Sequence, residues 1–203
     1  AEKGGRVYLT AGDTGTVEAG GTVTATKAGG NGTVQGGDIR VSGGTATVTG
    51  TLSAKGTGAK GGTVAVTGTS VTVTGTATVD ASGSRGGAIA VGGDYQGGKD
   101  AARKTLNEDV ANAKATTIAA GARLSADGTA GDGGSVVVWS DEHTDFAGTI
   151  TARGAGAGGK GGDAEVSGKA TLSFRGTADL TAAAGPFGTL LLSQAAPRDA
   201  EFA

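Results

Sequence analysis

The residues with the most chemical potential lie in one short segment, Ser140–Phe146. It holds three carboxylates, Asp141, Glu142 and Asp145, beside His143, the only histidine of the chain. Such groups can bind a metal ion, or act as a general acid and base on a polysaccharide. Neighbouring residues of a strand point to opposite faces, so the groups converge only where the chain turns. We interpret the segment as a polar turn, and predict no catalytic residue and no metal site.

A second candidate for chemistry is the glycine-rich segment Gly154–Gly162. Glycine-rich loops cradle phosphates when a helix follows and presents its N-terminus. No helical pattern follows here, so the segment is predicted to be a corner of the fold. The chain also has no cysteine, which excludes a thiol nucleophile, a cysteine-ligated metal and a disulfide framework. We expect no cofactor and no enzyme activity.

The segments around these motifs repeat along the chain. At each repeat a glycine, in most cases the second of a Gly-Gly pair, is followed by apolar residues two and four positions later. These openings are at Gly5, Gly37, Gly62, Gly87, Gly134, Gly162 and Gly188. The base period is about 25 residues, with two longer steps, and such a period is typical of solenoids.

Within each repeat, apolar and polar residues alternate as in Ile39-Arg40-Val41, which is the period of a strand. A second strand recurs later in each repeat, as in Gly148-Thr149-Ile150-Thr151-Ala152. Stacked coils would pair each strand with its equivalent in the next coil, about 4.8 Å away. The predicted fold is therefore all-β: a parallel β-helix of about seven coils, forming a single domain over residues 1–203.

Composition narrows the function classes. The chain has 43 glycines, two prolines and 3% aromatic residues, and its net charge is −2. Glycine suits tight corners, and phased apolar pairs argue against disorder. No basic run is present, so we expect no nucleic-acid partner and no anionic membrane surface. No apolar stretch is long enough for a membrane span.

The largest insertion covers residues 98–116. Leu106 and Val110 are four residues apart, with Ala102 and Ala113 on a similar face, which favours a short surface helix. The charged residues Arg103 and Lys104 make this segment a possible contact for a partner. The alternative is a solvated excursion with no partner.

Two aromatic residues are predicted to lie outside the coil. If Val136 and Val138 point inward, then Val137 and Trp139 point outward, because alternate residues of a strand face opposite sides. Tyr95 is expected outside as well. Exposed aromatic rings can stack on sugars or on a protein partner. The favoured interpretation is that the insertion covers them.

Several motifs between residues 85 and 192 resemble one protein family. They are Gly93-Asp94-Tyr95-Gln96-Gly97, Gly133–Asp141, Phe146–Gly154, Glu165–Lys169 and Gly188–Leu192. The motifs are similar to those of filamentous haemagglutinin-like exoproteins of two-partner secretion in Gram-negative bacteria. The resemblance implies a right-handed parallel β-helix in a secreted fibre, exported through an outer-membrane pore. Ser193-Gln194 replaces the usual Asp-Pro of the family, and the N-terminal secretion domain is expected to be missing.

The expected function is structural and adhesive: a segment of a cell-surface or extracellular fibre used in attachment, biofilm or filament formation. The expected partners are the chain itself, by end-to-end stacking or by continuation in a longer chain, a host or bacterial surface glycan or protein, and the secretion pore.

An ice-binding β-helix is the first alternative, because Thr-x-Thr pairs occur at 22–24, 45–47, 72–74 and 149–151. These pairs are expected to drift in register. A polysaccharide-active β-helix enzyme is the third hypothesis.

Overall fold

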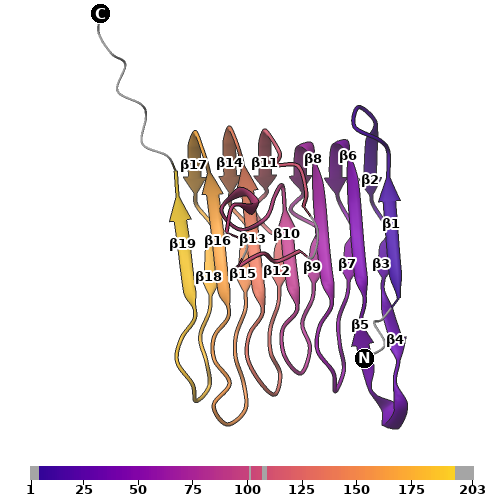
Figure 1. The fold of residues 1–203 in the computed structure, drawn as a ribbon, viewed down its shortest axis with the longest axis vertical. Coiled ribbons are helices and arrows are strands. Elements are labelled where there is room, and N and C mark those ends of the chain that lie inside the picture. Colours follow the sequence, from indigo (N-terminus) through magenta and orange to yellow (C-terminus); the bar gives the residue numbers. More distant parts are fainter. Residues whose placement is uncertain (1–4, 101, 107–108, 195–203) are drawn as a thin grey trace, which may run out of the picture.

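The computed structural model is a parallel β-solenoid of about 7 turns, which confirms the predicted fold class. The structure describes residues 5–100, 102–106 and 109–194. Successive turns stack side by side, so that the coil near the N-terminus and the coil near the C-terminus lie at opposite ends of the rod (Figure 1). All strand pairs of the two large sheets are parallel.

The larger sheet has 11 strands and forms two sides of the coil. Its strands are β1 (Arg6–Thr10), β2 (Thr16–Ala19), β6 (Asp38–Val48), β8 (Thr63–Val73), β10 (Ala88–Val91), β11 (Ala115–Ile118), β13 (Ser135–Ser140), β14 (His143–Phe146), β16 (Asp163–Gly168), β17 (Thr171–Phe174) and β19 (Thr189–Ser193). The long strands β6 and β8 cross from one side to the other. The first half of β8 pairs with β10, and its second half pairs with β11.

The smaller sheet has 6 strands, one from each of six coils. Its strands are β3 (Thr22–Thr24), β7 (Thr51–Ser53), β9 (Thr78–Asp80), β12 (Arg123–Ser125), β15 (Thr149–Thr151) and β18 (Thr177–Asp179). An antiparallel pair, β4 (Thr26–Ala28) and β5 (Val34–Gly36), lies near the N-terminal end. The two short 3-10 helices of the described residues are η1 (Gly30–Gly32) and η2 (Tyr95–Gly98).

The lumen is a stack of the apolar pairs that open each repeat. In register, Val64 pairs with Ile89, and Ile89 pairs with Val136. Five of the seven predicted inward pairs are buried in one core cluster: Ile39, Val41, Val64, Val66, Ile89, Val91, Val136, Val138, Ala164 and Val166. On the side formed by β14 and β17, the rings of Phe146 and Phe174 stack with centroids 5.2 Å apart. The inward pairs therefore form continuous apolar columns along the rod.

Glycine at the openings is required by the close approach of adjacent coils. A Cβ added at Gly87 would lie 2.0 Å from the carbonyl oxygen of Gly62, and one at Gly134 would lie 2.0 Å from that of Gly87. Real Cβ atoms do not approach backbone this closely. The repeated glycines therefore follow from the stacking itself and not from a need for flexible corners.

The expected surface helix in the insertion is wrong: none of the described residues from 99 to 116 is helical. Instead the chain leaves the coil at Gly92 and returns at Ala113, whose N–H donates to the Gly92 carbonyl at 2.6 Å. Ala113, assigned to a helix face, is in the lumen cluster. The segment 92–112 is here called the covering segment, and its described residues form a loop that is closed at its base.

We predict that a charge in the lumen costs far more stability than the same charge outside. Val66→Asp places a carboxylate among apolar columns with no partner, and should lower the free energy of unfolding by about 3 to 5 kcal/mol. Thr72→Asp, on an outward position, should cost about 0.5 kcal/mol. Chemical denaturation followed by circular dichroism measures both, and equal losses would contradict the assigned faces.

Candidate functional site

The predicted polar turn is shorter than expected: Asp141 and Glu142 lie in a bend, whereas His143 and Asp145 belong to strand β14. Each group contacts a different neighbour. Asp141 accepts hydrogen bonds from Trp139 and Asn112, and Glu142 is 4.0 Å from Lys114. Asp145 pairs with Arg175 at 2.7 Å, and His143 Nδ1 is 2.7 Å from the Thr171 hydroxyl. The described residues contain no group of three or more His, Cys, Asp or Glu side chains that could hold a metal ion. These side chains act as separate pairs between neighbouring coils.

Trp139 lies outside the lumen, on the side that strand parity predicts. Its indole Nε1–H donates to Asp141 Oδ1 at 3.1 Å. The ring lies against the covering segment, since a Cβ added at Gly93 or Gly97 would meet its atoms at 2.8 and 2.9 Å. Gly93 and Gly97 therefore provide the space that the indole occupies. The side chain is half-buried rather than a free platform.

Asp94 holds the covering segment together. Its carboxylate is 2% exposed and accepts three backbone hydrogen bonds. Oδ1 accepts from the N–H groups of Tyr95 and Thr105, each at 2.7 Å, and Oδ2 accepts from Leu106 at 3.0 Å. Hydrogen bonds to a charged acceptor are stronger than neutral ones. One side chain thus joins the start of the loop to a stretch more than ten residues further on.

A second apolar cluster fixes the covering segment to the coil. Leu106 is 2% exposed and packs on Ala65 and Ala90, with Val110 at the margin. Ala65 and Ala90 are neighbours in register on β8 and β10 and point away from the lumen. Leu106 and Val110, expected on a helix, therefore do share an apolar surface, although they reach it from an irregular loop. The small alanines leave room for Leu106 to approach the sheet.

Glu165 is a buried acid beneath this segment. It lies on β16 next to Val137 of β13 and is 1% exposed. The N–H of Gln96 donates to its Oε2 at 2.8 Å. Burial raises the pKa of the Glu165 carboxyl above its ordinary value, against the hydrogen bond from Gln96 and the charge of Arg103. Burial therefore disfavours the charged form of this carboxyl relative to a carboxyl in water.

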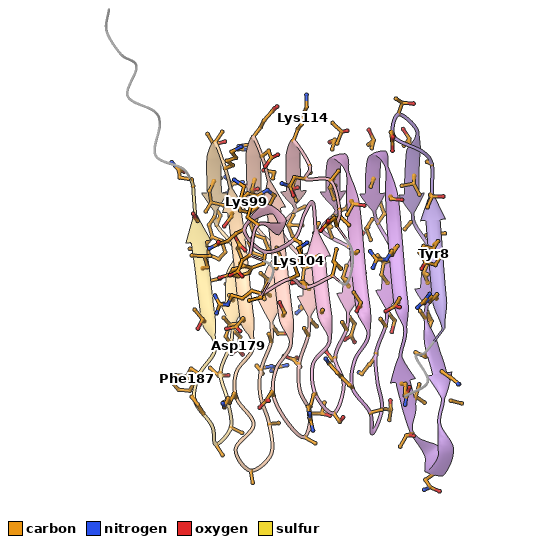
Figure 2. All side chains as sticks on the ribbon, in the orientation of Figure 1. Tyr8, Lys99, Lys104, Lys114, Asp179 and Phe187 are labelled. Carbon is orange, nitrogen blue, oxygen red and sulfur yellow. The ribbon has the colours of Figure 1, made fainter. Side chains whose placement is uncertain are left out.

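The other residues expected to contact a partner lie in or beside the covering segment. Tyr95 is 7% exposed, and its hydroxyl accepts a hydrogen bond from Arg103, whose guanidinium lies 4.9 Å from the ring centroid. Lys104 pairs with Asp109. Figure 2 shows Lys104 in front of the larger sheet, within the loop. The two aromatic residues are thus covered, and the cations Arg103 and Lys104 form the outer layer.

The threonine pairs are better aligned than the sequence suggests. Residues 22–24 and 149–151 belong to the smaller sheet, where five of six coils present threonine at one outward position: Thr22, Thr51, Thr78, Thr149 and Thr177, with Arg123 in the sixth. In the larger sheet Thr47, not Thr45, pairs with Thr72, so those two pairs are offset by two residues. The expected drift therefore holds for the larger sheet and is wrong for the smaller one.

The inward apolar pairs are exposed at the ends of the rod. Leu190 and Leu192 of β19 occupy lumen positions, in register with Ala164 and Val166, yet they are 37% and 44% exposed. At the other end, Val7 and Leu9 of β1 are only partly buried. Figure 2 places two exposed aromatic residues, Tyr8 and Phe187, in these opposite end regions.

The fold is similar to that of a solved secretion domain. No family model and no curated protein matches the chain. The crystal structure of the HMW1 secretion domain from Haemophilus influenzae matches with a TM-score of 0.57 and 26% sequence identity. The match covers 88% of this chain and 50% of that one, so the chain spans about half the length of this neighbour. This neighbour is a secretion domain, and a secretion domain is what the sequence was expected to lack.

The described residues include no helix long and apolar enough to cross a membrane.

Removing the Asp94 carboxylate should release the covering segment. Asp94→Ala leaves three backbone N–H groups without their acceptor, at a cost of about 1 to 3 kcal/mol for each group that stays buried. Trypsin should then cleave after Arg103 and Lys104 at least about tenfold faster. Asp13→Ala, which removes an exposed carboxylate outside this segment, is the control and should change the rate little. Unchanged cleavage in Asp94→Ala would show that the carboxylate does not hold the loop.

Glu165→Gln should stabilise the protein at neutral pH. Because the folded-state pKa is raised, the stability that protonated Glu165 provides is complete below the unfolded pKa and is lost as pH rises through the folded pKa. The glutamine side chain keeps an acceptor for Gln96 and does not ionise. Melting temperatures measured from pH 4 to pH 8 should diverge as pH rises, with the variant higher. The exposed Glu142→Gln is the control, and a variant that melts below wild type at pH 7 would contradict the prediction.

Proposed function

We propose that the chain is a structural segment of a secreted, extracellular rod that serves in attachment. One observation carries the proposal: the apolar columns of the lumen continue to the last described coil and are exposed there. Leu190 and Leu192 are in register with inward core residues, yet their side chains are exposed like those of surface residues. Such a pair is suited to burial by one more coil.

The strand edges support the same conclusion. The strands β17, β18 and β19 each have one paired neighbour among the described residues and one free edge. Free parallel edges can accept a further strand through main-chain hydrogen bonds. At the other end, β1 and β3 also have a single neighbour. A second copy that docks head to tail would continue both the hydrogen bonding and the lumen, and a contact of that kind does not close on itself.

Export is supported by two features of the chain. The motifs from residue 85 to 192 resemble those of two-partner secretion exoproteins, and the solved neighbour is named as a secretion domain. We propose that the chain passes an outer-membrane pore and acts outside the cell. The structural part is a stiff rod, and the contacts with a host or bacterial surface would come from the covering segment and the outward faces. Catalysis is not part of the proposal.

The self-association of the isolated 203-residue chain tests the open-end model. In sedimentation velocity, wild type should form a concentration-dependent series of oligomers. Leu190→Lys combined with Leu192→Lys should remove these oligomers, because two charges would have to be buried in the lumen of the next coil. The variant should keep the fold, since both positions are already exposed.

Thr189→Lys with Ser193→Lys provides the matched control. It adds the same charge to the same strand but on the outward face. This control should associate as wild type does. A wild type that stays monomeric at high concentration, or a control that is disrupted as strongly as the lumen variant, would contradict end-to-end stacking.

Binding to ice is a second candidate, favoured by the threonine column of the smaller sheet. The column repeats at the coil spacing of about 4.8 Å. Charged residues interrupt the face: Arg123 stands in the threonine column, and Asp80 and Asp179 stand in the adjacent one. We therefore rank it below the rod. Thermal hysteresis of the purified chain, lost in Thr51→Lys, would favour ice binding; no hysteresis is expected.

A further inference from the structure

A groove lies between the covering segment and the corners that open the coils. It has a volume of about 520 Å³, within the range of ligand sites. Its floor consists of three successive coil openings, residues 86–88, 133–135 and 161–163. One wall is formed by Tyr95 and residues 102–105, and the other by Lys60, Asp132 and Lys160. The groove therefore runs along the rod across several coils.

The corner wall is a row of equivalent positions. The N–H of Gly61 donates to the Arg85 carbonyl, that of Gly86 to Asp132, and that of Gly133 to Lys160. In the same way, the N–H of Gly36 donates to the Lys60 carbonyl. Lys60 and Lys160 are thus three coils apart, or about 14 Å at 4.8 Å per coil. This is the spacing of their backbone positions, and a ligand of several units is long enough to contact both lysines.

Some charged side chains of the groove already have a partner within the protein, and others do not. Arg103 is bound to the Tyr95 hydroxyl, and Lys104 pairs with Asp109. In the part of the chain that the structure describes, the exposed side chains of Lys60 and Lys160 have no ion pair. Two carboxylates, Asp132 and Asp163, also line the groove, and Asp132 Oδ1 already accepts a hydrogen bond from the N–H of Lys160 at 2.9 Å. Free ammonium groups suit an anionic ligand, and the carboxylates can accept hydrogen bonds from hydroxyl groups.

The walls do not fit the common modes of peptide binding. Strand addition needs a free edge, but β8, β10, β13 and β16 are each paired on both sides. A helix needs an apolar groove, whereas this floor presents Ala88, Ser135 and Asp163 at its outward positions. The glycines of the floor instead allow a ligand to approach the backbone closely. A chain rich in hydroxyl groups and carrying carboxylates satisfies every part of the lining.

We propose that this groove binds a segment of an acidic polysaccharide, with Lys60 and Lys160 contacting carboxylates of separate sugar units. The hydroxyl groups of the sugar would donate to Asp132 and Asp163, while the Arg103 side chain would form the rim. The site is distinct from the open ends of the rod. It gives the attachment role a ligand class without depending on whether the chain forms filaments.

Calorimetric titration of the full chain with hexagalacturonate tests the proposal. Wild type should bind, and affinity should fall as salt rises because the contacts are charged and exposed. The same hexamer with all carboxylates methyl-esterified keeps the length and most hydroxyl groups, and should bind at least about tenfold more weakly. Lys60→Ala with Lys160→Ala should lose at least about tenfold in affinity for the acid form.

Lys55→Ala with Lys169→Ala is the matched control, because it removes the same charge outside the groove. This control should bind hexagalacturonate as wild type does. An equal loss in the control, equal binding of the esterified hexamer, or no binding by wild type would overturn the proposal. Equally tight binding of hexa-aspartate would overturn the assignment to a saccharide. Repeating the titration with the Leu190→Lys, Leu192→Lys chain separates groove binding from filament formation.

Discussion

The whole structure depends on the stacking of equivalent strands along one axis. Each strand in the middle of the two large sheets bonds to its counterpart in the coil before and the coil after, as Ile89 of β10 does with Val64 and Val136. Because this pairing repeats, the inward positions form continuous and mostly apolar columns, and every corner must accept the backbone of its neighbours. The polar inward residues Thr116 and Thr144 are buried with their hydroxyl groups donating to backbone carbonyls. The Gly-Gly openings and the alternation of apolar and polar residues are both consequences of this geometry.

The same geometry determines where function can be added. An insertion that closes at its own base, from Gly92 to Ala113, leaves the ladder intact because the next strand resumes in register. The loop is then free to cover an outward face, where Asp94 organises its backbone and Leu106 packs on two alanines. Burial under the loop gives Glu165 a raised pKa, and the space beside the loop forms the groove. Recognition surfaces thus arise without any change to the lumen.

The sequence predicted the features that follow from the repeat, which are the inward and outward faces of the strands. It did not predict the contacts between residues that are far apart in the chain. The inward pairs and the outward position of Trp139 follow from a period of two, and the structure agrees. The helix assigned to Leu106 and Val110 was wrong because a spacing of four residues also suits a loop whose side chains meet a sheet. The roles of Asp94 and Glu165 could not be found, since their partners lie up to 69 residues away. The Gly93-Asp94-Tyr95 motif was the one signal near them.

The register of the coils can be measured directly, because the chain contains no cysteine. Thr47 and Thr72 are partners on adjacent strands, so their Cα atoms are about 4.8 Å apart, within the range of a disulfide. Thr45 is offset from Thr72 by two residues, which places its Cα atom beyond about 7 Å. Under mild oxidation, Thr47→Cys with Thr72→Cys should form an intramolecular disulfide, and Thr45→Cys with Thr72→Cys should not. The reverse result would contradict the stacked solenoid on which every surface described above depends.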